Sequence, residues 1–287
     1  MIDNNIKIIK DARFDSRNAG KFELALNISR CSLTAMINDV ESNKIVCFVE
    51  QVLDEFTPFD EYCEMVMNFI AHDSLQIPFS RVRVVLVTTK STLVPESLID
   101  PQNNSLLMGL NHDVEEVEEI LTCNVKNGSI LCLFVTNAWL KKIIVAKFPG
   151  CTIFHQCAPL IDGVMISVKN KVARKKVFVN VENEFFDLVV VNGENLLLHN
   201  TFPFQTDTDF VFYLMSVFEQ LKLNPQVNEV TFSGNVDYDS SFVILSRRFV
   251  KNVNFVSFTD EKEHISYAFD VLKLHKYVNL VNVFKCE

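Results

Sequence analysis

Carboxylate and amide side chains gather in one short segment, NVENEFFD, which lies at the corner between two apolar runs. A corner of this shape binds phosphate when glycines let several backbone N–H groups converge on the anion. Here Glu182, Asn183 and Glu184 occupy the turn, and the bulky Phe185 and Phe186 follow. Two carboxylates this close repel each other by about 1 kcal/mol or more at an intermediate effective dielectric. The residue types therefore argue against phosphate chemistry.

A second group of residues that could do chemistry is the pair His155 and Cys157. The pair could indicate a metal site or a nucleophile, but neither a third ligand nor an orienting carboxylate lies nearby in sequence. The chain contains no C-x-x-C pair and no G-x-S-x-G elbow. We therefore interpret the pair as structural, and expect no metal and no catalytic residue.

Composition limits the classes of partner. The net charge of −9 over 287 residues argues against a nucleic-acid-binding face, because phosphate contacts need clustered lysine and arginine. The basic run at 169–176 is interpreted as a linker. The start of the sequence shows no signal peptide, and no apolar run is long enough to insert into a membrane. Eight cysteines without a disulfide pattern favour a reduced, cytoplasmic protein.

The elements that must position these residues occur twice along the chain. Alternating apolar residues predict a three-stranded meander over 21–51, and a second one over 176–202. Each meander is followed by an amphipathic helix, a proline and a buried strand. The repeated order predicts an α/β fold with mixed sheets, in which two similar halves surround a cleft.

The halves are predicted as 1–170 and 171–287. The first carries a strand-helix-strand-helix insert near 129–170, preceded by a short acidic helix over 112–125. That helix is either a solvated face or a dock for a basic partner. We also expect a closing helix near 263–277, which could pack back on the first half.

The element order resembles the actin-like ATPase superfamily of actin, sugar kinases and Hsp70 chaperones, whose fold is ribonuclease H-like. In that superfamily each half begins with a hairpin that cradles phosphates, and the second reads Asp-hydrophobic-Gly-Gly-Gly-Thr-Thr-Asp-Leu. In this chain Asn180 stands at the first Asp, residues 182–184 at the glycines and 185–186 at the threonines, while Asp187 matches.

Two further segments carry the resemblance. In the first hairpin, LNISRCSL, Asn27 stands at an Asp position and Ser29 at a Gly position. Ser233, Gly234 and Asn235 stand where the superfamily places a Gly-Gly pair against the nucleoside, and only Gly234 is retained. The resemblance thus implies phosphate-loop positions at Asn27, Ser29, Asn180, Glu182, Asn183, Glu184, Phe185, Phe186 and Asp187.

The chain is most similar to the pilus-assembly and secretion branch and to an uncharacterised bacterial family with an actin-like fold. The resemblance implies ATP with magnesium as the cofactor, but the altered motifs favour no cofactor and no enzyme activity. We expect a non-catalytic scaffold or regulator that binds other proteins. The alternatives are a nucleotide-dependent switch of the pilus-assembly type, and an enzyme acting on a small substrate in the cleft. Nothing in the sequence indicates the oligomeric state.

Overall fold

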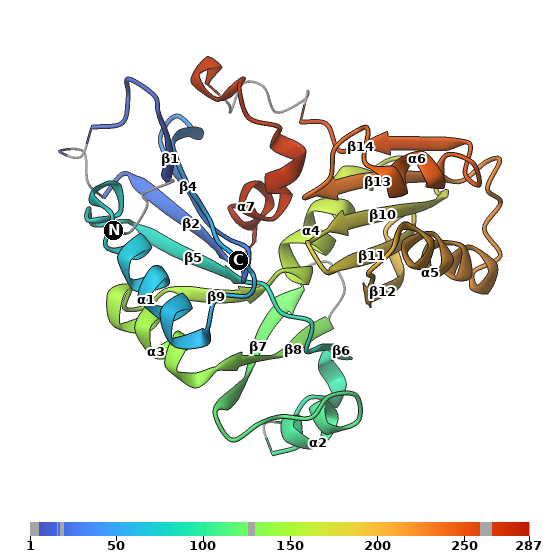
Figure 1. Cartoon of the computed structure of the whole chain (residues 1–287), viewed down its shortest axis with the longest axis horizontal. Helices are drawn as coiled ribbons and strands as arrows, with labels where there is room; N and C mark the ends of the chain where they lie inside the picture. Colours follow the sequence, from blue (N-terminus) through green and yellow to red (C-terminus); the bar gives the residue numbers. More distant parts are fainter. Residues whose placement is uncertain are drawn as a thin grey trace. The chain divides into compact units, whose positions relative to one another are not determined.

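The computed structural model of the chain forms two compact units (Figure 1). It describes residues 6–15, 17, 20–100, 102–125, 130–258 and 266–286. The first unit comprises 1–159, 259–272 and 279–287, and the second comprises 160–258 and 273–278. These units are defined by their internal contacts, so the division into two actin-like halves between 170 and 171 stays a prediction.

The first unit is built on a six-stranded sheet with the order β1-β4-β3-β2-β5-β9. Its strands and its first helix are β1 (Ile6–Lys10), β2 (Phe22–Ile28), β3 (Ser32–Asp39), β4 (Lys44–Val52), α1 (Phe59–Ile70), β5 (Arg81–Leu86) and β9 (Thr152–His155). The meander β2-β3-β4 is antiparallel, whereas β5 pairs parallel to β2 and β9 pairs parallel to β5. The sheet is therefore mixed, as predicted.

The second unit repeats this arrangement in a five-stranded sheet with the order β12-β11-β10-β13-β14. Its elements are β10 (Lys175–Val181), β11 (Phe185–Asn192), β12 (Asn195–Pro203), α5 (Asp207–Gln220), β13 (Glu229–Gly234), α6 (Ser241–Ser246) and β14 (Asn252–Phe255). The meander β10-β11-β12 is antiparallel, and β13 and β14 pair parallel on its other side. The predicted duplication of strand-strand-strand-helix-strand is confirmed.

The two meanders also agree in detail. Asn27 lies opposite Thr34, and Asn180 lies opposite Asp187, so the two hairpins have the same length. Each second strand shifts register against the third, between Ile37 and Asn38 in β3 and between 190 and 191 in β11. This bulge falls at the same distance from the hairpin in both halves. Equal hairpins and equal bulges support one backbone plan used twice.

The first unit contains a separate small sheet. It has the order β6-β8-β7, from β6 (Ser91–Pro95), β7 (Glu118–Val125) and β8 (Ile130–Asn137), with α2 (Asn104–Gly109) packed against it. Of these strands only β8 falls within the predicted insert near 129–170. The predicted strand-helix-strand-helix order follows as β8, α3 (Ala138–Lys147), β9 and α4 (Cys157–Val168). Residue 129 lies outside the described residues.

The prediction of an acidic helix over 112–125 is wrong, because 118–125 forms β7. The antiparallel pairing with β8 satisfies the backbone of this segment. Two glutamates of this strand have a lysine partner instead. Glu118 lies 2.9 Å from Lys90, and Glu119 lies 2.5 Å from Lys141.

The end of the chain also differs from expectation. Of the helix predicted near 263–277, residues 263–265 lie outside the described part. The rest contains two short 3-10 turns, Tyr267–Phe269 and Leu274–Tyr277, and the α-helix α7 (Val278–Val283) follows them. The buried Arg83 guanidinium pairs with Glu23 at 3.1 Å and donates to the Cys286 carbonyl at 3.2 Å. No helix among the described residues is long and apolar enough to cross a membrane.

The core of the second unit lies between the sheet and α5. Alternate residues of β10 and β11 face this helix, among them Val179 and Phe186. Phe186 is fully buried, and its ring lies 5.4 Å from that of Phe202 and 4.3 Å from that of Phe210. The neighbouring Phe185 is half-buried and, by strand alternation, points to the opposite face. One ring of this pair therefore packs into the core and the other does not.

This difference between neighbours leads to a stability prediction. Phe186→Ala should lower the free energy of unfolding by about 3–5 kcal/mol, because it leaves a cavity among aromatic rings. Phe185→Ala should cost much less, since its side chain keeps contact with solvent. Urea unfolding followed by circular dichroism measures both. Equal losses for the two variants would contradict the assignment of faces.

Candidate functional site

A row of polar side chains crosses the second sheet on the face opposite Phe186. Thr201, Asp187, Asn180 and Ser233 lie directly beside one another in β12, β11, β10 and β13. We call these four residues the polar row. Polar groups in the middle of a sheet stay there only if they are hydrogen-bonded, so their partners define what the site can do.

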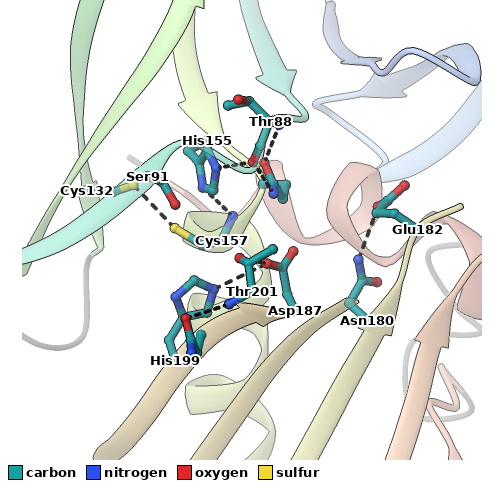
Figure 2. Close-up of polar contacts among 12 residues, drawn as sticks. Thr88, Ser91, Cys132, His155, Cys157, Asn180, Glu182, Asp187, His199 and Thr201 are labelled. Carbon is teal, nitrogen blue, oxygen red and sulfur yellow. Dashed lines mark hydrogen bonds and ion pairs between the residues drawn. The ribbon is translucent and has the colours of Figure 1, made fainter. Parts of the chain in front are cut away.

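Asp187 is the central carboxylate of the polar row. It is fully buried, and its Oδ1 accepts a hydrogen bond of 2.6 Å from the Thr201 hydroxyl (Figure 2). His199 Nε2 lies 3.6 Å from the same oxygen, and the His199 side chain is almost fully buried. These contacts hold the carboxylate in place within the sheet. A carboxylate held this way is a structural anchor more than a free metal ligand.

Neither Thr201 nor His199 was among the predicted site residues, and the register explains why. Counting outward from the Asn192–Asn195 pair would place Asn200 opposite Asp187. The bulge between 190 and 191 shifts the pairing by one residue and brings Thr201 there instead. The only signal in the sequence is that His199 and Thr201 are two residues apart in the same strand, so their side chains lie on the same face of the sheet.

At the next position of the row, Asn180 uses both ends of its amide. Its Oδ1 accepts from the Ser233 hydroxyl at 3.1 Å, and its Nδ2 donates to Glu182 Oε1 at 3.2 Å. The side chain of Glu182 therefore folds back onto the position that the superfamily gives to an aspartate. Asn180 is fully buried, and its amide cannot act as a base that activates water.

Desolvation, together with the negative charge of Asp187, raises the pKa of Glu182 to about 8, although the hydrogen bond from Asn180 lowers it. Glu182 therefore carries a proton at neutral pH, and only the exposed Glu184 adds a full charge to this corner. The sequence led us to expect two charged carboxylates that repel each other at this turn. The structure reduces that expectation to one, because desolvation favours the neutral acid.

The segment after β13 closes the corner from the other side. Asn235 donates from its backbone to the Val181 carbonyl and from Nδ2 to Asn183 Oδ1 at 2.7 Å. Gly234 has φ +84°, and a Cβ there would lie 2.2 Å from the Val181 oxygen and 2.9 Å from Asn180 Oδ1. Packing within the unit is thus sufficient reason for a glycine at 234. The structure brings all three predicted nucleoside-loop residues against the second hairpin.

The first hairpin contains the remaining predicted residues, Asn27 and Ser29. The Ser29 hydroxyl accepts from the backbone N–H groups of Cys31 at 3.3 Å and Ser32 at 2.9 Å. It also donates to the Ser32 carbonyl at 3.0 Å. The loop N–H groups that glycine would leave open for an anion are therefore bonded to the loop itself. Asn27 Oδ1 is buried and has no hydrogen-bond partner in the described chain.

Both hairpins are thus closed in the same way. Ser29 N–H donates to the Ser32 carbonyl at 3.0 Å, and Glu182 N–H donates to the Phe185 carbonyl at 2.8 Å. Magnesium prefers carboxylate oxygens and water, and phosphate prefers converging N–H groups. These positions offer amide side chains, a protonated acid and occupied N–H groups. The residues present fit ATP and magnesium poorly.

Comparison with solved structures gives the fold. The chain superposes with a TM-score of 0.81 on a Bacteroides thetaiotaomicron protein with actin-like ATPase fold and unknown function, at 18% identity, covering 96% of this chain and 99% of that one. The chain therefore has an actin-like ATPase fold.

Two further structures are similar at lower scores. The PilM–PilN type IV pilus biogenesis complex matches with a TM-score of 0.55 at 9% identity, over 90% of this chain and 97% of the other. The ethanolamine utilization protein EutJ from Carboxydothermus hydrogenoformans matches with a TM-score of 0.52 at 9% identity, over 96% and 92%. These likenesses concern the fold alone.

No curated protein matches the sequence. The family model described as protein of unknown function (DUF3822) matches residues 11–253, which is most of the chain. The actin-like fold and this match agree with the resemblance found in the two hairpins. The chain belongs to the DUF3822 family of proteins of unknown function.

Proposed function

We propose that this protein is a non-catalytic member of the actin-like fold class that works by binding other proteins. The observation that carries the proposal is the closure of both hairpin turns. In each turn the backbone N–H of the first residue bonds to the carbonyl three residues on, and in the first the Ser29 hydroxyl occupies two more N–H groups. Loops closed in this way have little left to offer a phosphate.

A surface for a partner is available beside the first hairpin. The connection 52–61 carries Val52 with 64% of its surface exposed, Phe56 with 81% and Phe59 with 38%. A single exposed apolar residue is ordinary, but three within one short connection are typical of an interaction site. We call Val52, Phe56 and Phe59 the apolar connection.

The apolar connection is anchored to the hairpin. Leu53 N–H donates to the Cys31 carbonyl at 2.8 Å. The Arg30 guanidinium donates to the carbonyls of Glu55 and Thr57, and it lies 4.6 Å from the Tyr62 ring. Arg30, which could otherwise reach an anion at the hairpin tip, is thus used to position a surface.

The chemistry of the connection indicates the kind of partner. Acidic side chains are interspersed with the apolar ones, namely Asp54, Glu55, Asp60 and Glu61. A protein segment with alternating apolar and basic residues would complement both, and the net charge of −9 favours such a partner. The similar PilM–PilN structure is itself a complex of two proteins, which supports a binding role for this fold.

Loss of the exposed ring should abolish partner capture. In affinity capture from the native cell extract, we expect the wild-type protein to retain a specific partner protein and Phe56→Ser to lose it. The reason is that the Phe56 ring would fill a pocket on the partner. Phe212→Ser is the matched control, since Phe212 is 65% exposed but lies on α5. Identical capture by wild type and Phe56→Ser would exclude this surface.

ATP with magnesium should not bind at millimolar nucleotide. A ligand present at 100 times its dissociation constant adds about 2.7 kcal/mol of stability. We therefore expect no change in melting temperature between magnesium alone and magnesium with ATP, and no heat in calorimetry. Micromolar affinity would instead favour the nucleotide-dependent switch. Gly234 is unsuitable as a mutational control, because any side chain there would clash with the backbone of Val181.

The raised pKa of Glu182 gives a pH prediction. The unfolded chain ionises this acid near its ordinary pKa of 4.5, whereas the folded chain holds the proton until about 8. The folded form thus binds more protons in this window, so wild-type stability should fall as pH rises through it. Glu182→Gln removes this contribution, and its stability relative to wild type should rise between about pH 5 and pH 8.

The neighbouring Glu184→Gln is the control, because Glu184 is exposed. Denaturant unfolding of the three proteins at several pH values measures the differences. A constant difference between Glu182→Gln and wild type over the whole window would contradict the buried, protonated state of Glu182.

A further inference from the structure

Three cysteines and one histidine that are far apart in sequence meet inside the first unit. Cys123 lies in β7, Cys132 in β8, His155 at the end of β9 and Cys157 at the start of α4. We call these four residues the thiol cluster. Cys132, His155 and Cys157 are fully buried, and Cys123 is nearly so. The sequence suggested only the pair at 155 and 157, because Cys132 comes from β8 of the small sheet and lies 25 residues before Cys157 in the chain.

The distances in the cluster suit a single ion. One ligand atom each from Cys132, His155 and Cys157 lies within 4.8 Å of the others, and the two sulfur atoms are 3.4 Å apart. Figure 2 shows these three side chains directed toward one another. A tetrahedral zinc ion with Zn–S bonds of about 2.3 Å places its sulfur ligands about 3.8 Å apart. The cluster needs only a small adjustment to reach that spacing.

Cys123 can supply a fourth sulfur by moving toward the other three, because its Sγ is not among the ligand atoms that all lie within 4.8 Å of one another. It is the cross-strand partner of Cys132, and its Sγ accepts from the His155 backbone N–H at 3.4 Å. Three sulfur ligands and one imidazole are a common set in structural zinc sites.

The surroundings of His155 fix which nitrogen would bind. Its Nε2 lies 2.9 Å from the Thr88 carbonyl, which can only accept, so Nε2 carries the proton. Gln156 holds the same carbonyl from a second side at 2.8 Å. The lone pair therefore lies on Nδ1, which accepts a hydrogen bond of 3.2 Å from the Cys157 backbone N–H, and a metal bound at Nδ1 would replace this bond. A backbone carbonyl that orients a histidine in this way is the usual outer partner of a zinc ligand.

We propose that the thiol cluster is a zinc site, with Cys132, Cys157 and His155 Nδ1 as ligands and Cys123 completing the tetrahedron. Zinc replaces the thiol protons, which leave to solvent as each sulfur forms its bond to the metal. Three thiolates and one zinc ion carry a net charge of −1, and the metal neutralises most of the thiolate charge, which makes burial of the cluster less costly than burial of unpaired thiolates. The ion would join the small sheet, through β7 and β8, to β9 of the large one.

The wild-type chain supplies the first test. Full-length protein is refolded under reducing conditions with cobalt as the spectroscopic probe, and then titrated with zinc. We expect one equivalent of cobalt to give thiolate-to-metal charge-transfer bands and tetrahedral d–d bands, which zinc then abolishes. Folded wild-type protein without these bands would overturn the proposal.

The variants assign the ligands. Cys157→Ser should lose the charge-transfer intensity or weaken cobalt binding by at least about tenfold, by comparison with the 10–100-fold effects of outer-shell changes. Cys63→Ser should keep it, since Cys63 is an equally buried thiol of α1 outside the cluster. An unchanged spectrum in folded Cys157→Ser would refute the assignment.

Proton release keeps the test decisive if Cys157→Ser does not fold. Each cobalt ion bound by wild-type protein should release about two protons or more into a weakly buffered solution, because at least two thiols must ionise. Binding without proton release would place the metal elsewhere and contradict the proposal.

Discussion

Two backbone hydrogen bonds, one in each hairpin turn, fix the arrangement on which the rest of the chain depends. They run from Ser29 N–H to the Ser32 carbonyl and from Glu182 N–H to the Phe185 carbonyl. Each sets the register of its hairpin, and a slip of one residue would exchange the two faces of the strand. With the register as it is, Phe186 enters the aromatic core and Asp187 enters the polar row. The same bond therefore decides packing on one face and chemistry on the other.

The closed turns also explain how an actin-like fold can be kept while its phosphate positions change. Glycine loops leave N–H groups free at a cost in chain entropy. Here the Ser29 hydroxyl accepts a hydrogen bond from a backbone N–H of its own loop. In the second hairpin, the Asn235 side chain donates to the Asn183 side chain. These substitutions turn loops that would wait for a ligand into loops that are complete without one. Arg30, at the tip of the first, supports a neighbouring surface instead.

The sequence was sufficient for features governed by local pattern. Alternation revealed both meanders, and their repeated order revealed the duplication, because strand and helix periods are read directly from residue types. The actin-like fold came from the resemblance of this order to a known superfamily. Features set by distant pairing were not accessible. The acidic residues near Glu118 suggested a helix, yet pairing with β8 makes this segment a strand. Thr201 reached Asp187 only through a bulge, and Cys132 met Cys157 only through the folding of the insert.

The bulge in β11 and β12 has one more consequence, for association between chains. In the described part of the second sheet β12 is the outermost strand, whereas in the first sheet β1 covers β4. An outermost strand exposes backbone groups that can template pairing with another chain. The irregular register at residue 190 and the proline at 203 interrupt that template. The feature that aligns Thr201 with Asp187 therefore also protects the open side of the sheet against edge-to-edge aggregation.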